Sequence, residues 1–199
     1  MSLGDLADEF KKCFLAAVSK NFLDILQFLI EENVTDVNTK EERTLMTALH
    51  YACVKDAYDC AACLVKNGAD VNAMTVDGCT PLYFSASMGS FRIVRLLVEH
   101  QAEVDVRNFH GNSSLFAAAA QGFLDIVKFL HGCGADVNVV DDDGDVPLHD
   151  AAARGHVEVL QYLISNKGDV NCRNKSGKLP IDLARDNEQE EIVKVLQAF

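Results

Sequence analysis

The sequence predicts an all-α repeat protein, an α-solenoid of stacked helix-turn-helix units with projecting β-hairpins. Two observations carry this prediction: an apolar position recurs every 33 residues, and a glycine recurs with the same period. The apolar residues are Leu49, Leu82, Leu115, Leu148 and Ile181, and the glycines are Gly78, Gly111, Gly144 and Gly177. A fixed period of this length indicates one supersecondary unit copied along the chain. Because such a unit cannot bury its apolar face alone, stacking against neighbours has to form the core.

Residues 79–111 show what each unit contains. Thr80 and Pro81 are typical of a helix start, because a threonine hydroxyl caps free N–H groups and proline suits the first turn. Gly89 ends this short helix, and apolar residues from Phe91 onward recur at the spacing of a second amphipathic helix. Residues 108–111 then have the composition of a β-turn. Each unit is therefore predicted to contain a helix, a turn, a second helix and a hairpin.

At these residues the chain resembles the ankyrin-repeat family. The matching motifs include Thr80-Pro81-Leu82, Pro147-Leu148-His149 and the closing segment Gly134-Ala135-Asp136-Val137-Asn138. The resemblance covers nearly the whole chain and implies a single ankyrin-repeat domain over residues 1–199. The expected repeats span residues 8–45 (N-terminal cap), 46–78, 79–111, 112–144, 145–177 and 178–199 (C-terminal cap).

Three residues depart from the repeat pattern. Leu45 stands where later hairpins have glycine, so we expect the first hairpin to turn differently. Gln101 and Lys167 replace the glycine that ends the second helix, which is typically a position of left-handed backbone conformation. Each of these two replacements is expected to cost about 1 kcal/mol of stability relative to glycine.

Composition and charge exclude several classes of protein. With 49% hydrophobic and 24% charged residues, the chain is predicted to fold rather than to be disordered. No apolar run approaches the roughly eighteen residues that a membrane span needs, and the start of the chain lacks the basic-then-apolar order of a signal peptide. The formal net charge of −12 argues against binding to nucleic acid or to anionic lipid.

The seven cysteines are odd in number and lack the spacing of a disulfide framework. Cys60 and Cys63 form the only close pair, with no second pair and no histidine at ligand spacing, so we expect neither a metal site nor a redox site. Small core residues in a reducing compartment account for them. We therefore expect an intracellular, cytoplasmic protein, with the nucleus as the alternative, that is monomeric on its own.

No catalytic constellation and no cofactor motif emerges from the sequence. His50 and His149 belong to the structural Leu-His pair of the repeat, and His131 is expected to be partly exposed, the alternative being a pH-sensitive core residue. Residues 139–150 resemble a calcium loop only superficially, because Val139 would be the first ligand. The chain is therefore predicted not to be an enzyme and to need no cofactor.

The resemblance implies that partners dock on a concave face formed by the hairpin tips and the first helices. We therefore predict a non-enzymatic adaptor, scaffold or inhibitor that binds another protein; the alternative is the recognition domain of a larger enzyme, channel or signalling protein. Exposed Met and aromatic residues on this face favour an interface over surface residues scattered without a role. The candidate partner-binding residues are Val54, Lys55, Met74, Val76, Ser87, Met88, Arg107, Phe109, Gln121, Val140, Asp142, Asp145, Asp150, Arg154, Arg173 and Lys175.

Asp150 is the most distinctive of these candidates, because most other repeats carry an apolar residue at its position. Those residues are Tyr51, Phe84, Ala117 and Leu183. If the hairpin folds over the first helix, Asp142, Asp145 and Asp150 converge and attract a Lys- or Arg-containing segment of the partner. Alternatively, Asp150 pairs with Arg154, four residues later on the same helix. The sequence leaves both interpretations open.

Three asparagines are candidate modification sites. Asn72, Asn138 and Asn171 each follow Asp-Val and lie eight residues after a leucine. These segments resemble the sites that asparaginyl hydroxylases modify in other ankyrin proteins. The alternative, which we favour, is that each asparagine simply hydrogen-bonds within its own hairpin.

Overall fold

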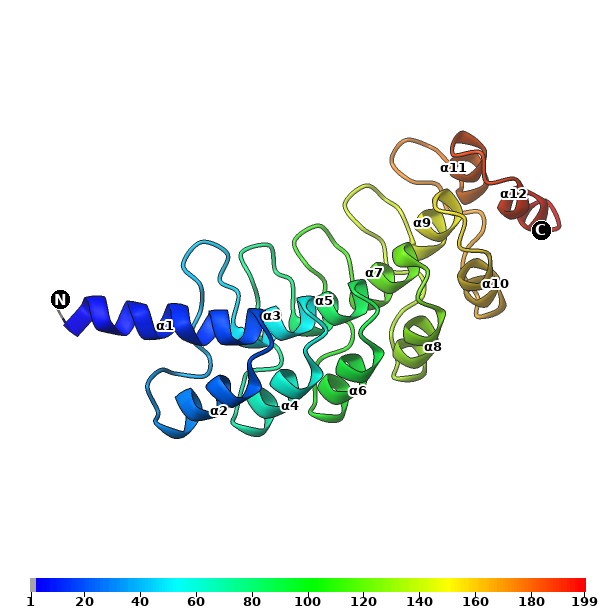
Figure 1. Ribbon diagram of the computed structural model, residues 1–199. Helices are drawn as coiled ribbons and strands as arrows, with labels where there is room; N and C mark the ends of the chain where they lie inside the picture. The colour runs from blue at the N-terminus through cyan, green and yellow to red at the C-terminus, as the bar shows by residue number, and fades with distance from the viewer. Residues whose placement is uncertain (1–2) are drawn as a thin grey trace. The chain divides into compact units, whose positions relative to one another are not determined.

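A computed structural model describes residues 3–199, with side chains from Glu9 onward (Figure 1). The described residues form twelve α-helices and no strand, which confirms the predicted all-α repeat class. They belong to two compact parts, here called the N-terminal half (Met1–Glu103) and the C-terminal half (Val104–Phe199). The N-terminal half contains α1 (Leu3–Ser19), α2 (Leu23–Glu31), α3 (Ala48–Val54), α4 (Tyr58–Lys66), α5 (Pro81–Ser87) and α6 (Phe91–Glu99). The C-terminal half contains α7 (Ser114–Gln121), α8 (Leu124–Gly132), α9 (Pro147–Ala153), α10 (Val157–Ser165), α11 (Pro180–Asp186) and α12 (Glu190–Leu196).

Helix pairs stack in two layers within each half (Figure 1). In the N-terminal half the first helices α1, α3 and α5 contact one another in order, and so do the second helices α2, α4 and α6. In the C-terminal half α7, α9 and α11 form one layer and α8, α10 and α12 the other. The recurring leucines lie fully buried between these layers, at Leu49, Leu82, Leu115 and Leu148. The apolar residues that recur every 33 positions in the sequence are therefore the ones that form the core.

The first helices begin with two kinds of side-chain cap. Thr80 Oγ1 accepts a hydrogen bond from the Tyr83 N–H at 3.2 Å, which confirms the cap predicted from the Thr-Pro motif. Where the repeat has Leu-His, the imidazole caps instead, and His149 Nδ1 accepts from the Val146 N–H at 3.1 Å. His149 Nε2 lies 3.2 Å from the Lys178 carbonyl oxygen, so the same ring also ties one repeat to the next.

The loops between repeats contain the predicted turns, but they form no strand ladder. In one of them the Asp141 N–H donates to the Asp145 oxygen at 3.0 Å, and the Gly144 N–H donates to the Asp141 oxygen at 3.1 Å. Asp141 Oδ1 then accepts from the N–H groups of Asp143 and Asp145, both at 2.9 Å. Because a side chain takes up N–H groups that a ladder would use, the loop closes as a turn rather than as paired strands.

The first loop turns with the same handedness as the later ones, although it lacks their glycine. Leu45 has a φ of 57°, and Gly78 at the corresponding position has 74°. The hydrogen bonding differs, as predicted, because the Leu45 N–H reaches back to the Glu41 oxygen at 2.9 Å, which is one residue farther than in the Gly78 loop. The Glu41 carboxylate fixes this turn by accepting from the N–H groups of Arg43 and Thr44 at 3.2 and 2.8 Å.

Left-handed backbone conformations close the second helices as well. Gln101 and Lys167 have φ values of 67° and 70°, which confirms the conformation predicted for them. At the loop tips the requirement for glycine is stronger. A Cβ atom on Gly111 would lie 2.8 Å from the Asp141 Cα atom, so the close approach of the next loop excludes a side chain there in addition to the φ of 81°.

Asparagine side chains connect successive loops within each half. Asn138 Nδ2 donates to the Lys167 carbonyl oxygen at 3.0 Å, and Asn138 Oδ1 accepts from the Asp169 N–H at 3.0 Å. Asn38 and Asn72 make the corresponding pairs of contacts in the N-terminal half. Each asparagine thus satisfies one donor and one acceptor of the following loop and fixes the spacing between neighbouring repeats.

Candidate protein-binding surface

The loop tips are held to one another by backbone hydrogen bonds inside each half. In the N-terminal half the Val76 N–H donates to the Thr44 oxygen at 2.9 Å, and in the C-terminal half the Asp142 N–H donates to the His110 oxygen at 2.9 Å. The loops project on one side of the helices within each half (Figure 1). Because their backbones are fixed by neighbours, they present their side chains from preorganised positions.

Five of the apolar candidates on this surface are exposed. Met74, Val76 and Met88 belong to the N-terminal half, whereas Phe109 and Val140 belong to the C-terminal half. Phe109 is the most exposed of the five, with 68% of its surface accessible. Each half therefore carries its own group of exposed apolar side chains on loop tips or at the end of a first helix.

The remaining candidates lie at the ends of the first helices and on the loops. Val54, Ser87 and Gln121 are the last residues of α3, α5 and α7. Val54 and Ser87 are half-buried, so they contribute less accessible surface than the sequence analysis assumed. The exposed polar candidates are Lys55, Arg107, Gln121, Asp142, Arg154, Arg173 and Lys175.

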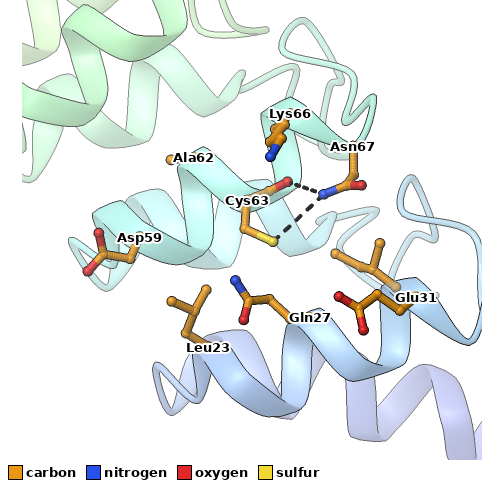
Figure 2. Close-up of a pocket in the computed structure, with 9 residues that line it drawn as sticks. Leu23, Gln27, Glu31, Asp59, Ala62, Cys63, Lys66 and Asn67 are labelled. Carbon is orange, nitrogen blue, oxygen red and sulfur yellow. Dashed lines mark hydrogen bonds between the residues drawn. The ribbon is translucent and has the colours of Figure 1, made fainter.

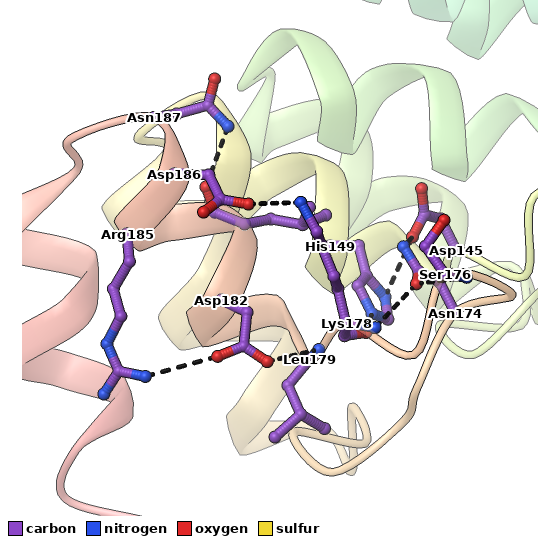
Figure 3. A network of polar contacts seen from close by, with 11 residues as sticks. Asp145, His149, Asn174, Ser176, Lys178, Leu179, Asp182, Arg185, Asp186 and Asn187 are labelled. Carbon is purple, nitrogen blue, oxygen red and sulfur yellow. Dashed lines mark hydrogen bonds and ion pairs between the residues drawn. The ribbon is translucent and has the colours of Figure 1, made fainter.

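Asp145 is held inside the C-terminal half by two neighbours (Figure 3). Its Oδ1 atom accepts a hydrogen bond from Asn174 Nδ2 at 2.8 Å and lies 3.8 Å from His149 Nδ1. Lys175, on the same loop as Asn174, contacts the Asp142 carbonyl oxygen with its ammonium group. The acidic loop at Asp141–Asp145 is therefore bound to the following loop by both an amide and a lysine.

Asp150 lies on α9, and its Oδ1 atom is 3.4 Å from Arg154 Nε. The internal pairing proposed as one alternative is thus present. Burial raises the pKa of Asp150, the charge of Arg154 lowers it, and the charges of Asp145 and Asp141 raise it further. The structure therefore groups Asp150 electrostatically with Asp145 and Asp141, while the Asp142 side chain is exposed at the loop tip. Asp150 thus pairs with Arg154 and also lies within the electrostatic influence of two further carboxylates.

A second polar network closes the last repeat (Figure 3). Asp182 Oδ2 accepts from the Leu179 N–H at 3.1 Å and caps α11, while Arg185 Nη1 lies 3.3 Å from Asp182 Oδ1. Lys178 Nζ donates to Asp186 Oδ2 at 2.5 Å, and this bond raises the pKa of Lys178. Asp182 therefore caps the start of α11, while Arg185 and Lys178 each form an ion pair with a carboxylate of the same helix.

His50 and His149 are structural, as predicted, because each caps a first helix and contacts the following repeat. Burial lowers the pKa of His50 to about 4. His131 is half-buried, and its Nδ1 atom lies 2.8 Å from the Tyr162 hydroxyl, which confirms the partly exposed histidine expected there. Among the side chains that the structure describes, from Glu9 onward, no group of three or more His, Cys, Asp or Glu is placed to hold a metal ion.

A groove between α2 and α4 escaped the sequence analysis (Figure 2). It measures about 380 Å³ and is lined by Gln27 and Glu31 on one side and by Cys63 and Asn67 on the other. Asn67 Nδ2 donates to the Cys63 carbonyl oxygen at 2.8 Å and lies 3.8 Å from the Cys63 sulfur. Burial raises the pKa of Cys63, so the thiol lacks the thiolate character that nucleophilic or redox chemistry needs.

The candidate hydroxylation sites differ in their surroundings. The Asn72 and Asn138 side chains bond to the loop of the following repeat, so the expectation that they bond within their own hairpin was wrong. The reason is that stacking brings the next loop closer to the amide than the rest of its own loop. Asn171 is exposed in the last of these loops, and its N–H donates to Asp169 Oδ1 at 2.9 Å.

Comparison with known proteins identifies the family. The family description "Ankyrin repeats (3 copies)" matches residues 13–108 and 115–198, and "Ankyrin repeats (many copies)" matches residues 86–131. The chain belongs to the ankyrin-repeat family. Ankyrin repeats are protein–protein interaction modules, so this ankyrin chain is a protein-binding module. Among residues 3–199, none of its helices has the length and apolar character needed to cross a membrane.

Curated relatives share the repeats over part of this chain. The Nuclear factor NF-kappa-B p105 subunit of Gallus gallus is 42% identical over 73 residues, which are 36% of this chain and 7% of the relative. The Mus musculus p105 subunit is 40% identical over 78 residues, covering 39% of this chain and 8% of the relative. The Glycerophosphocholine phosphodiesterase GDE1 of Eremothecium gossypii is 36% identical over 79 residues, covering 39% and 6%. The chain thus matches less than a tenth of each of these relatives.

Proposed function

We propose that this ankyrin protein is a non-enzymatic adaptor, scaffold or inhibitor that acts in the cytoplasm or nucleus. It binds its partner through loop tips and first-helix residues of each half, which we call together the tip surface. The tip surface comprises Val54, Lys55, Met74, Val76, Ser87, Met88, Arg107, Phe109, Gln121, Val140, Asp142, Asp145, Asp150, Arg154, Arg173 and Lys175. The exposure of Phe109 on a preorganised loop is the observation that carries this proposal.

Phe109 protrudes from a loop whose neighbouring residues are fixed. Asn108 is buried, its N–H donates to the Asn112 oxygen at 3.0 Å, and the Gly111 N–H donates back to the Asn108 oxygen at 2.9 Å. An exposed aromatic side chain on a fixed loop loses little conformational freedom when a partner covers it. Aromatic residues of this kind supply a large part of the binding energy at protein interfaces.

The partner presents a Lys- or Arg-containing segment to the C-terminal half. Asp142 is exposed at the tip, Asp145 closes the same loop, and Asp150 lies on α9, the helix that follows. A cation placed beside Asp150 would oppose the burial that raises its pKa and would add a charge-assisted hydrogen bond. Charged groups at the rim of an interface mainly accelerate association, so the effect depends on salt.

The role of Phe109 in partner binding is tested by affinity capture from the source cells, with quantitative mass spectrometry of the bound proteins. Phe109→Ser is expected to reduce capture of the specific partner at least tenfold, because Phe109 is the largest exposed apolar side chain on the tip surface. Phe199→Ser is the matched control, since Phe199 is also highly exposed but lies at the chain end. Equal capture by Phe109→Ser and wild type would contradict the proposal.

The contribution of the acidic residues to partner binding is tested by measuring the affinity for the captured partner, or for a Lys/Arg-rich peptide, as the salt concentration is raised. The double variant Asp142→Asn, Asp150→Asn is expected to bind more weakly at low salt and with a shallower salt dependence. Asp125→Asn with Glu158→Gln removes the same charge from exposed positions on α8 and α10 and serves as the control. The same affinity and salt slope in both double variants would show that the acidic cluster takes no part in binding.

A further inference from the structure

The first repeat exposes three large apolar side chains on one side of α2. Phe22, at the start of this helix, is 50% exposed, Ile25 is 48% exposed and Phe28 is 58% exposed. Their spacing of three residues places them along one face of the helix. Cys13 and Ala16 on α1 are also exposed. We call these five residues the end face.

The same positions are covered in later repeats. Ile25 corresponds in the repeat to Cys60 and Ile93, which are both fully buried. The cover is the preceding helix pair, because α4 packs on α2 and α6 packs on α4. The contact is direct at Cys60, whose thiol donates to Asn21 Oδ1 of the preceding repeat at 3.3 Å. The end face is therefore a stacking surface of the fold that no described residue covers.

The opposite end of the chain is built differently. On α2 the side facing the next repeat carries Leu23 and Gln27, which line the groove against α4. The corresponding residues of α12 are Glu190 and Lys194, both charged and exposed. A charged surface suits contact with water, as a terminal cap requires. The last repeat is capped by polar side chains, whereas the first repeat has an apolar end.

Charged residues border the end face with opposite signs. Lys12 is exposed on α1 and Lys20 directly after it, and Asp24 and Glu32 are exposed on and just after α2. The two helices are antiparallel neighbours, so Lys20 and Asp24 lie near the connecting turn. Lys12 is eight residues before Lys20, and Glu32 is eight residues after Asp24. At about 1.5 Å of rise per residue, both separations are about 12 Å. The two lysines on or directly after α1 and the two carboxylates on or just after α2 are therefore equally spaced, and each lysine lies at the same height as one carboxylate.

We propose that the end face binds the end face of a second copy of this chain. A two-fold axis parallel to α1 and α2 would lay α1 of each copy across α2 of the other, as an isologous contact requires. In that arrangement Lys20 meets Asp24 of the second copy, Lys12 meets Glu32, and the apolar residues cover one another. Under this proposal the chain, expected from the sequence to be monomeric on its own, associates with a second copy.

The size of the end face sets the strength of the dimer. Half-exposed phenylalanines leave roughly 100 Å² each, so the three large side chains leave roughly 300 Å² of apolar surface per copy. Two copies would cover roughly twice that area, plus the bordering lysines and carboxylates. Stable specific interfaces bury about 1,200–2,000 Å² in total. The dimer is therefore weak and assembles at micromolar or higher concentrations.

Sedimentation equilibrium of the full chain over about 5–500 µM tests the association directly. The average mass of the wild type is expected to rise from 21.8 kDa toward twice that value. Phe28→Asp is expected to stay monomeric throughout. Phe109→Asp introduces the same change on the tip surface and is expected to associate like the wild type. A wild type that stays at 21.8 kDa, or loss of association in Phe109→Asp, would overturn the proposal.

A charge exchange tests the register of the two edges. Lys20→Asp and Asp24→Lys, each made alone, are expected to weaken dimerisation at least tenfold, because each places like charges opposite one another. The double variant restores an opposite pair and is expected to recover most of the wild-type association. If the double variant dimerises no better than the single variants, the two-fold arrangement is wrong.

Cysteine labelling supplies an independent measurement on the unmodified chain. Cys13 and Cys133 are both exposed, but Cys13 alone lies on the end face. Alkylation of Cys13, followed by peptide mass spectrometry, is expected to slow several-fold as protein concentration rises, while Cys133 reacts at a constant rate. Equal concentration dependence at the two cysteines would contradict the proposed interface.

Discussion

His50 shows how a buried polar residue can cap a helix and carry a pH dependence. Its Nδ1 atom accepts from the Thr47 N–H at 3.0 Å, and its Nε2 atom lies 3.2 Å from the Cys79 oxygen. The ring also meets Phe84 edge-on, with centroids 5.7 Å apart. Protonation would remove the acceptor that caps α3 and would place a charge in the core. Burial accordingly lowers the pKa of His50 from 6.5 to about 4.

This shift predicts a loss of stability in mildly acidic solution. The unfolded chain takes up a proton at the His50 position below pH 6.5, while the folded chain resists protonation until about pH 4. The part of the free energy of unfolding that comes from neutral His50 is therefore fully present above pH 6.5. It is lost as the pH falls toward 4, by up to roughly 3 kcal/mol. Urea unfolding of wild type and His50→Gln between pH 7 and 4 measures it. Between pH 7 and pH 4 the free energy of unfolding should fall further in the wild type than in His50→Gln. The variant His110→Gln, at an exposed histidine, should show the same pH dependence as the wild type. If the free energy of unfolding of His50→Gln falls with pH as steeply as that of the wild type, His50 is not the source of the pH dependence.

Gln101 allows a second test at the scale of one residue, because its backbone has a φ of 67°. Gln101→Gly is expected to stabilise the chain by about 0.5–1 kcal/mol, since glycine adopts this conformation without strain. Gln161 is exposed in the middle of α10, where glycine is unfavourable. Gln161→Gly is therefore expected to destabilise by about 1 kcal/mol. Thermal or urea unfolding of both variants should give changes of opposite sign, and equal signs would rule out backbone strain at Gln101.

The loops, at the scale of the element, depend on their bridging asparagines. Asn138 gives a donor and an acceptor to the following loop, whereas Asp105 at the same position accepts only, from the Asp136 N–H at 3.1 Å. A carboxylate cannot donate, so this repeat makes one bridge instead of two. The loops are therefore joined with different strength along the chain, although their backbones look alike.

Removal of one bridge has a defined cost. Asn138→Ala is expected to lower the free energy of unfolding by about 1 kcal/mol, because it removes two exposed hydrogen bonds to the next loop, and such bonds contribute about 0.5 kcal/mol each. Asn171→Ala, at the corresponding position of the last loop, is expected to cost less than about 0.5 kcal/mol. Urea unfolding of the two variants compares them directly. A larger effect at Asn171 than at Asn138 would show that the bridge contributes little.

At the scale of the whole molecule, stability follows the number of neighbours that each repeat has. The α3–α4 pair is packed between two helix pairs of the N-terminal half, and α9–α10 is packed between two pairs of the C-terminal half. Terminal repeats have one such neighbour, so they open first. Hydrogen exchange is expected to be fastest at Phe199 and in the first loop, and slower in α3–α4 and α9–α10 than in α1–α2 and α11–α12. Uniform protection from Leu15 to Leu196 would contradict this expectation.

Much of the fold was predictable because the repeat encodes it locally. The leucines at the position of Leu82 occupy the same core position in four repeats, and Thr80 and Ser113 cap their helices with their hydroxyl oxygens. The candidate surface was less predictable, since the sequence left open whether Asp150 pairs with Arg154 or faces a partner. The structure shows the pair and also the nearby carboxylates of Asp145 and Asp141, which lie in another segment. The repeat pattern does not specify how close the side chains of different segments lie.

Ile25 and Ile93 separate what the sequence determined from what the tertiary structure decided. Both residues hold the same place in the repeat, and the amino-acid pattern alone determined that each lies on an apolar face of a second helix. Ile93 is fully buried, but Ile25 is 48% exposed. Periodicity reports which way a side chain faces along its own helix, whereas burial depends on whether another helix packs against that face. Only the tertiary structure could show that the first repeat lacks such a neighbour within the described residues.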